Sequence, residues 1–336
     1  IPEEFGGMGL GFVELAAVLE QMGRTLLCSP FFFSFFLGAH SLLVAGTDAQ
    51  KNEYLPLMVE GALTATLAYT GKQAAHGGGT WGADAVQATY KKSGDNYVLN
   101  GTLRYVIDGH TADLLIIAAR TENSKGAEGI SLFAVPASTA GVTRKWLPTM
   151  DQTRHQAEVL LDNVTVSAST LMGTETQAWP QLKKIISLAK IAVSAEQMGG
   201  AQEMLDKTVA FTQERVQFGR AIASFQAIKH KAADMMLKCE VARSAVYYAA
   251  CVAQEAMSAD GDATIAAELD EAAAMAKCYC SDTFFFNAGS AIQMYGGVGF
   301  TWEYDPHLYF KRAKSSELFL GNGAQQRELI AQMLLD

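Results

Sequence analysis

The sequence predicts an α+β protein in three parts. These are an N-terminal helical domain over residues 1–63, a small β-barrel domain over 64–168 and a C-terminal four-helix bundle over 169–336. Apolar residues recur at helical spacing in the first part, every second position is apolar in the next, and long helical patterns return after residue 168. A chain of 336 residues is long enough to bury a sizeable core in each part.

The N-terminal domain begins with a glycine-rich loop and continues as helices. The loop runs over Pro2–Gly11, the next helical pattern over Phe12–Met22, and that pattern closes at Gly23. A short helix is expected over Asp48–Met58. Since no strand precedes the glycines of the loop, they do not form the dinucleotide-binding fingerprint and are expected to be a flexible connection.

The segment Pro30–Ala45 is the one candidate for a membrane span. It is shorter than the ~20 apolar residues that a bilayer requires, and Ser34, Gly38, His40 and Ser41 interrupt it. We therefore expect a buried core helix and no membrane partner.

The second part carries the strand patterns of the chain. The expected strands are Ala85–Tyr90, Tyr97–Ile107, Leu114–Ala119, Ile130–Val135 and Val159–Val166. Turn sequences at Gly94-Asp95, Asn100-Gly101 and Gly126 separate them. Several short strands at this spacing favour a small barrel or sandwich.

The third part returns to long amphipathic patterns with short connections. Expected helices are Gln181–Gln213, Phe225–Asp260, Ala263–Tyr295 and Pro306–Leu335, the last covering one or two helices. Four such helices predict an antiparallel bundle. Gly199 and Gly200 lie inside the first of them, where they would allow close contact between helices.

Composition and charge restrict the partners. The net charge of −9 argues against a nucleic-acid partner, because phosphate binding needs a basic surface. The five cysteines, an odd and irregularly spaced set, indicate reduced thiols and a cytoplasmic location. Cys278 and Cys280 are too close for the usual metal knuckle and point about 200° apart on a helix, so the sequence predicts no metal centre.

Two motifs identify a family. Glu214–Lys229 reads ERVQFGRAIASFQAIK, a tight glycine turn between two helical patterns, and Gln293–Phe300 reads QMYGGVGF. Both resemble signatures of the acyl-CoA dehydrogenases, and the resemblance extends over essentially the whole chain. It implies an FAD-dependent oxidoreductase of lipid metabolism that converts an acyl-CoA to a trans-2-enoyl-CoA, works as a tetramer and passes electrons to an electron-transferring flavoprotein. It starts at Ile1–Gly11, so we expect the N-terminal domain to be truncated at its start.

The resemblance assigns flavin contacts from the bundle. Arg215 is similar to the arginine that pairs with the FAD pyrophosphate of the neighbouring subunit, a role suited to a guanidinium fork. Phe218 resembles the aromatic residue that packs on that cofactor. The remaining contacts implied are Gln226, Gln293, Gly296 and Gly297. Taken singly, Arg215 suits a helix cap and Gln226 a wet helix face, whereas all of these residues together at the family spacing favour the flavin role.

The β domain matches the family with departures. Thr70, at the end of Leu67–Thr70, and Tyr105 resemble the residues that contact the isoalloxazine ring. The family's Glu-Pro after the threonine is Gly71-Lys72 here, and its tryptophan and threonine are Tyr105 and Ile107. The loop His76–Trp81 has no counterpart of the family's serine. Packing in a strand is the alternative role of Tyr105.

The catalytic base of the family is absent. Removing a proton α to a thioester needs a nearby carboxylate in an apolar pocket. The common position of that glutamate corresponds to Leu320 and its alternative position to Ala189, neither of which accepts a proton. The backbone N–H of Leu320 can still polarise the thioester carbonyl.

Three interpretations follow for the base. Glu196 lies on the helix face of Ala189, about 10 Å further along, either as a displaced base or as a buried polar contact. Glu317 is one turn before Leu320 but matches a non-catalytic glutamine of the family. In the third interpretation, which we prefer, a related partner chain supplies the base.

The third interpretation rests on a resemblance to a subgroup. Phe310–Gly321 and Ala195–Ala201 resemble subunits of bacterial heteromeric acyl-CoA dehydrogenases of steroid side-chain degradation. Those enzymes assemble as α2β2 and act on bulky acyl-CoA esters. The alternatives are a non-catalytic scaffold subunit of such an enzyme and a flavin oxidase relative on the same fold.

Overall fold

The computed structural model describes residues 1–72 and 81–335, and the chain folds into two compact units. We call the first the sheet unit; it comprises Ile1–Leu10, Ser29–Thr149 and Arg154–Ala189. The second, the bundle unit, comprises Gly11–Cys28, Met150–Thr153 and the chain from Lys190 onward. Each unit is therefore assembled from segments that are far apart in the sequence.

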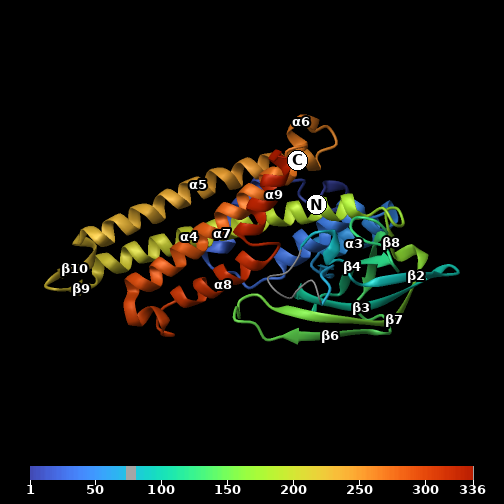
Figure 1. Cartoon of the computed structure of the whole chain (residues 1–336), viewed down its shortest axis with the longest axis horizontal. Helices are drawn as coiled ribbons and strands as arrows, with labels where there is room; N and C mark the ends of the chain where they lie inside the picture. Colours follow the sequence, from blue (N-terminus) through green and yellow to red (C-terminus); the bar gives the residue numbers. More distant parts are fainter. Residues whose placement is uncertain (73–80, 336) are drawn as a thin grey trace. The chain divides into compact units, whose positions relative to one another are not determined.

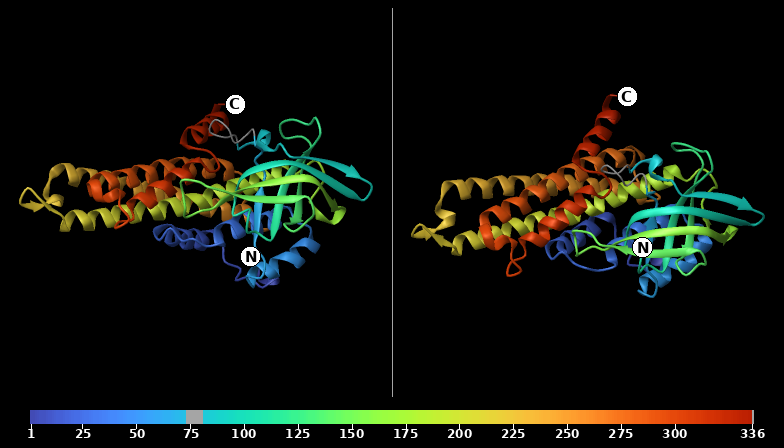
Figure 2. Two further views of the ribbon diagram at one scale, coloured as in Figure 1. Left: turned by 90° about the horizontal axis from the view of Figure 1, so that it is seen from below. Right: turned by 60° about the horizontal axis from the view of Figure 1, so that its bottom comes forward.

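The sheet unit is built on one mixed sheet, seen in two orientations in Figure 2. Its strands are β1 (Ala65–Ala68), β2 (Thr89–Ser93), β3 (Asn96–Ile107), β4 (Leu114–Thr121), β5 (Ile130–Pro136), β6 (Val142–Leu147), β7 (Gln156–Ser167) and β8 (Leu171–Met172). They are ordered β6-β7-β3-β2-β4-β5-β8, with β1 beside β4. β1 and β2 run parallel to β4, and the remaining pairs are antiparallel. The apolar runs of β4 and β5 are almost completely buried, which is why they lack alternation in the sequence.

The phenylalanine-rich segment is part of the core of the sheet unit. Phe33–Ala39 forms a π-helical stretch that continues as α2 (His40–Ala45), and Phe33, Phe36 and Leu37 are buried. A second helix, α3 (Asp48–Val59), begins at Thr47, whose side chain accepts from the Gln50 N–H. The predicted core helix is thus confirmed, and within residues 1–72 and 81–335 no helix combines the length and apolarity needed to cross a bilayer.

The bundle unit holds the long helices (Figure 1). They are α1 (Phe12–Arg24), α4 (Trp179–Glu214, whose first turns to Ala189 belong to the sheet unit), α5 (Gln226–Met257), α6 (Ala263–Ala266), α7 (Leu269–Tyr295), α8 (Pro306–Leu318) and α9 (Gly323–Leu335). α7 packs against α5, α8 and α9. Their shared core includes Met204, Met235, Phe284, Met294 and Tyr309. The predicted sequence of N-terminal helices, sheet and C-terminal bundle is confirmed.

Three details of the prediction were wrong. The strand expected over Ala85–Tyr90 begins only at Thr89 and continues to Ser93, because Ala83–Ala85 forms a 3₁₀ turn. Ala263–Tyr295 is not one helix, because the chain breaks between α6 and α7. No glycine or proline lies between α6 and α7, so the sequence does not indicate this break. Strand β6 was missed, since it is an exposed strand that pairs only with β7 and shows little apolar patterning. Residues 76–80 of the His76–Trp81 loop lie outside the described residues.

Glycines bring α1 and α4 into backbone contact, as the close helix packing predicted for Gly199 requires, and Gly200 instead faces the Phe284 ring of α7. A Cβ on Gly199 would lie 1.8 Å from the Glu20 carbonyl oxygen, and one on Gly23 would lie 2.0 Å from that of Glu196. Each glycine therefore leaves room for a backbone carbonyl of the other helix, and any side chain at either position would separate the two helices.

Candidate functional site

The turn between α4 and α5 is a strained, exposed hairpin. β9 (Val216–Gln217) pairs with β10 (Arg220–Ala221), and the two turn residues, Phe218 and Gly219, have φ of 55° and 76°. Two successive positive φ angles define a type I′ turn. Glycine adopts this conformation freely, but a bulky aromatic residue does so at a cost. Phe218 is also 92% exposed, so the strain holds an aromatic ring out in solvent and indicates a functional role.

Arg215 stands at the base of this hairpin with its guanidinium exposed. Its carbonyl accepts from the Ile222 N–H at 2.8 Å, which closes the hairpin around it. Among the described residues, no carboxylate pairs with the Arg215 guanidinium. The group is therefore available to a diphosphate, as its predicted role requires.

The C-terminal end of α7 presents the other predicted flavin residues of the bundle. Gln293, Gly296 and Gly297 are exposed, and a Cβ at either glycine would meet no atom within 4 Å. Tyr295 stacks on Phe211 of α4 with ring centroids 4.0 Å apart, which joins this end of α7 to the last turn of α4. Figure 1 shows the β9–β10 hairpin and the end of α7 at the same end of the bundle. Gln226, the first residue of α5, is exposed there too.

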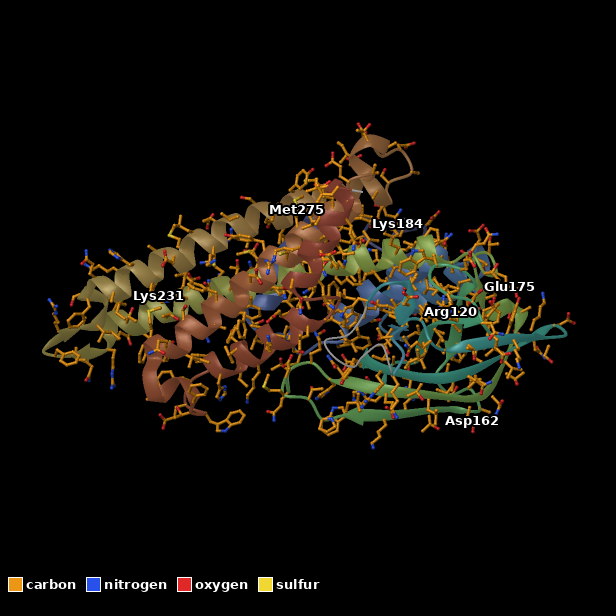
Figure 3. All side chains as sticks on the ribbon, in the orientation of Figure 1. Arg120, Asp162, Glu175, Lys184, Lys231 and Met275 are labelled. Atoms are coloured by element: carbon orange, nitrogen blue, oxygen red, sulfur yellow. The ribbon has the colours of Figure 1, made fainter. Side chains whose placement is uncertain are left out.

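An open groove begins at Gln293 and runs between α5, α7 and α8. It has a volume of about 620 Å³. Lys231, labelled in Figure 3, and Lys238 hold their ammonium groups 5.1 and 4.9 Å from the centre of the Phe286 ring. The other residues that line it are Asp282, Phe285, Gly289, Ser290, Gln293, Phe310 and Glu317. Half-buried rings flanked by ammonium groups suit a planar ring system that carries phosphates.

The two predicted flavin contacts of the sheet unit are neighbours. The Thr70 hydroxyl donates to the Arg104 carbonyl at 3.0 Å, and the Arg104 N–H donates to the Thr70 carbonyl at 2.9 Å. Tyr105 follows at once with φ of 55°, where β3 shifts register against β7 between Leu103 and Val106. This backbone is not that of an ordinary strand, so a bulge directs the Tyr105 ring away from the regular alternation.

Leu320 lies in the tight connection between α8 and α9. It is 1% exposed and has φ of 60°. Gln326 Nε2 donates to its carbonyl at 2.8 Å, and the Lys277 ammonium donates to the carbonyls of Glu317 and Gly321 at 3.0 Å each. No described residue accepts a hydrogen bond from the Leu320 N–H. The connection is thus held largely through its carbonyl groups, and the Leu320 N–H lies at its centre without a described protein acceptor.

Lys277 is a fully buried lysine that sequence reasoning missed. It lies in an alanine-rich stretch of α7, where its surroundings predict a core position, and its third hydrogen bond goes to Ser281 Oγ at 2.8 Å. Burial, together with repulsion from Lys190, lowers the pKa of Lys277 to about 7, while Glu317 opposes the shift. A lysine on the apolar side of a helix pattern is the signal that could have identified it.

Glu196 does not face an open pocket. Its carboxylate forms an ion pair with Arg312 Nη1, and both side chains are buried. Arg312 also lies 3.2 Å from Asp151 Oδ2 and donates to the Thr153 hydroxyl and carbonyl at 2.8 and 2.9 Å. An adjacent guanidinium stabilises the charged carboxylate and so weakens it as a base. The geometry favours the buried polar contact over the displaced base.

The other candidate positions also lack a carboxylate poised to take a proton. Ala189 is fully buried. Glu317 lines the groove, but its carboxylate accepts from Lys314 Nζ at 3.0 Å. Arg312, like Lys277, was missed, because its partners lie 116 and 161 positions earlier in the chain.

The order of helices, sheet and bundle is typical of a class of flavoprotein oxidoreductases. Three family models match in turn. The acyl-CoA dehydrogenase N-terminal domain covers residues 1–62, the middle domain 75–164 and the C-terminal domain 177–335. The chain belongs to the acyl-CoA dehydrogenase family, whose cofactor is FAD, and the predicted fold class is confirmed.

Individual relatives agree with this assignment. The 3-(aryl)acrylate reductase of Clostridium sporogenes is 30% identical and matches over 100% of this chain and 86% of its own length. Subunit CarC of the caffeyl-CoA reductase-Etf complex of Acetobacterium woodii is 28% identical, with coverage of 100% and 86%. The structure of butyryl-CoA dehydrogenase from Megasphaera elsdenii is 29% identical and superposes with a TM-score of 0.90, covering 100% of this chain and 86% of that one.

Proposed function

We propose that this chain is one subunit of a heteromeric, FAD-dependent acyl-CoA dehydrogenase that acts on a bulky, steroid-type acyl-CoA. In this proposal the chain assembles as α2β2 with a related chain that carries the base. The observation that supports it most is Leu320, a buried apolar residue at the position where the family places a glutamate. Glu196, the carboxylate that could have replaced it from α4, is paired with Arg312.

The residues present fit FAD. Arg215 would hold the pyrophosphate, and Phe218, Gln226, Gln293, Gly296 and Gly297 would contact the rest of the cofactor of a neighbouring subunit. Thr70 and Tyr105 would contact the ring system held by this subunit. When bound, FAD accepts the electrons removed from the acyl chain. The unpaired Arg215 guanidinium and the open space at the two glycines support this assignment.

Leu320 would act through its backbone. Its N–H, fixed by the hydrogen bonds of its own carbonyl and its neighbours' carbonyls, would donate to the thioester carbonyl and stabilise the negative charge that develops there. The same group would serve the reverse reaction, because a 2-enoyl-CoA passes through the same charge distribution when it is reduced. A reductase direction, suggested by the names of two relatives, therefore changes neither its role nor the need for a carboxylate.

Exposed apolar side chains at the end of the bundle support a second subunit. Val216, Phe218 and Phe300 are 57%, 92% and 66% exposed. Such side chains gathered around cofactor contacts are typical of an interface. A related subunit that brings its own flavin would cover them. An electron-transferring flavoprotein is the proposed electron acceptor, in line with the Etf complex to which one relative belongs.

The experiment is native mass spectrometry of the protein expressed with and without the genes that neighbour its own. We expect an α2β2 species that retains FAD only when the partner is present, with dye-coupled turnover of acyl-CoA confined to that species. A homotetramer with four FAD that turns over alone would contradict the proposal. An α2β2 species whose turnover survives loss of every flavin contact of this chain would favour the scaffold role, and substrate-dependent oxygen uptake would favour the oxidase.

A further inference from the structure

The register of β3 and β7 places Asp108 opposite His155 in the sheet unit. Ile107 pairs with Gln156 at the end of the antiparallel ladder, and the next hydrogen bond joins the Asp108 N–H to the His155 carbonyl at 3.0 Å. Asp108 has φ of 47°, which turns the chain sharply. Its carbonyl accepts from the Thr111 and Ala112 N–H groups, both at 3.0 Å.

The turn brings His110 onto the same two residues. Its ring lies 5.6 Å from that of His155 in an edge-to-face arrangement. The ligand atoms of Asp108, His110 and His155 lie within 4.8 Å of one another. His110 Nδ1 is buried, and no described residue forms a hydrogen bond with it. A buried imidazole nitrogen without a partner is costly unless something else occupies it.

We propose that Asp108, His110 and His155 form a binding site for a divalent ion of the zinc class. Two imidazoles and one carboxylate match the donor preference of Zn²⁺ and its neighbours better than that of Mg²⁺ or Ca²⁺. Donors around one tetrahedral Zn²⁺ lie about 3.3 Å apart, so small side-chain rotations close the site. His155 is exposed and the other two are half-buried. The ion therefore keeps a solvent-facing coordination position and joins the end of β3 to the start of β7.

One neighbouring charge opposes the ion. The Arg144 guanidinium acts on His110 electrostatically, although Nη1 is held at the Ala112 carbonyl at 2.7 Å. Trp146 of β6 packs against His155, with ring centroids 6.1 Å apart, and shields one side of the site. Arg144→Gln removes the repulsion and leaves the three ligands in place. It should therefore raise the affinity for the ion, whereas the ligand variants should lower it.

The test is calorimetric titration of the FAD-loaded protein with Zn²⁺, in a Cys28→Ser/Cys251→Ser background that removes the two exposed thiols. We expect one Zn²⁺ per chain, with affinity lowered at least about tenfold in each of Asp108→Asn, His110→Ala and His155→Ala. His230→Ala, which removes an exposed histidine of α5, should bind as the parent does, and Arg144→Gln should bind more tightly. Co²⁺ bound in place of Zn²⁺ should give visible absorption that the ligand variants lose.

The proposal does not depend on the catalytic role of the chain, because its readout is metal binding. Equal affinity in the parent and in the two histidine variants would overturn it. So would binding that is detectable only at millimolar Zn²⁺. Thermal unfolding serves as the second readout, since Zn²⁺ should raise the Tm of the parent but not that of the three ligand variants.

Discussion

Arg312 and Glu196 form a buried ion pair in the bundle unit, and the Asp151 carboxylate lies 3.2 Å from Nε of the same guanidinium. The net charge of the three groups is negative by one, so Arg312 neutralises one of two carboxylates that lie out of water. A buried ion pair contributes little net stability compared with an apolar core, but removing a partner so that a buried charge is left unpaired is strongly destabilising.

Removing one member of this set should destabilise the protein. We expect Glu196→Gln to lower the free energy of unfolding by roughly 1.5–3 kcal/mol, because it weakens a charge-assisted hydrogen bond to Arg312, while Asp151 still neutralises the guanidinium. Urea unfolding followed by circular dichroism would measure this, with Glu328→Gln, an exposed glutamate of α9, as the control. Unchanged stability combined with abolished turnover would instead identify Glu196 as a base.

Arg215→Ala should release FAD. The Arg215 guanidinium stands at the base of the hairpin without a carboxylate partner among the described residues, so its loss removes a charge-assisted contact that is typically worth ~1.5–3 kcal/mol. Flavin content per chain, read from absorbance, should fall in the co-purified complex. Arg215→Lys should restore it only in part, because an ammonium lacks the bidentate geometry. Arg220→Ala is the matched control, since Arg220 belongs to the same hairpin and stacks on Phe225 at 4.1 Å. Equal flavin loss in both alanine variants would count against the specific role of Arg215.

Phe218→Asn should make the protein more stable and a poorer flavoprotein. Asn-Gly is the preferred sequence for a type I′ turn, and an asparagine relieves about 1 kcal/mol of left-handed strain. The aromatic contact with the cofactor disappears at the same time. A rise in Tm accompanied by weaker FAD retention would support the interpretation. Retention that stays unchanged would show that the exposed ring serves another partner.

Lys277 should make the stability depend on pH. Its pKa is about 7 in the folded chain and ordinarily near 10.5. Between these values the unfolded chain holds more protons at this residue than the folded one, so the free energy of unfolding rises with pH across the window, by at most about 1.4 kcal/mol per unit. In Lys277→Met this contribution should vanish, whereas Lys229→Met, at an exposed site of α5, should keep the parent profile. Parallel profiles for the parent and Lys277→Met would exclude the effect.

Leu320→Glu should supply the missing carboxylate. The site is buried, which raises the pKa of a carboxyl group and suits it to take a proton near neutral pH. We expect exchange of the α-protons of a bound acyl-CoA with D₂O to accelerate on the order of 10²-fold, measured by mass spectrometry of the recovered ester. Leu320→Gln is the isosteric control. Equal exchange rates in both variants would mean that this position does not reach the α-carbon.

The helices and the candidate flavin contacts were inferred from the sequence for different reasons. The helices of the bundle followed from periodicity, as in Gln226–Met257, because burial of one face is a local pattern. Arg215, Phe218 and Gln293 followed from the resemblance to family motifs, and the β9–β10 hairpin and the end of α7 that carry them lie at the same end of the bundle (Figure 1). What spacing could not reveal is that Phe218 is strained and exposed, since φ depends on the turn that the flanking strands impose.

Long-range polar sets were not predictable. Arg312 and Asp151 are separated by 161 positions, and His110 meets His155 only because β3 and β7 pair in one particular register. A single residue of slip in that ladder would point Asp108 and His155 away from each other. The sequence contains the residues of both sets, but which of them become neighbours depends on how the strands and helices are arranged.

The crossing of α1 and α4 has a consequence for the order of folding. Gly23 and Gly199 fit against carbonyls of helices that are separated in the chain by most of the sheet unit. During synthesis, α1 must wait for more than a hundred residues to emerge before its partner exists, and closing so long a loop is slow. Until α4 has been synthesised, the apolar face of α1 is exposed to solvent, so this helix is a candidate for chaperone binding. Replacing both glycines with alanine should therefore lower the yield of folded protein.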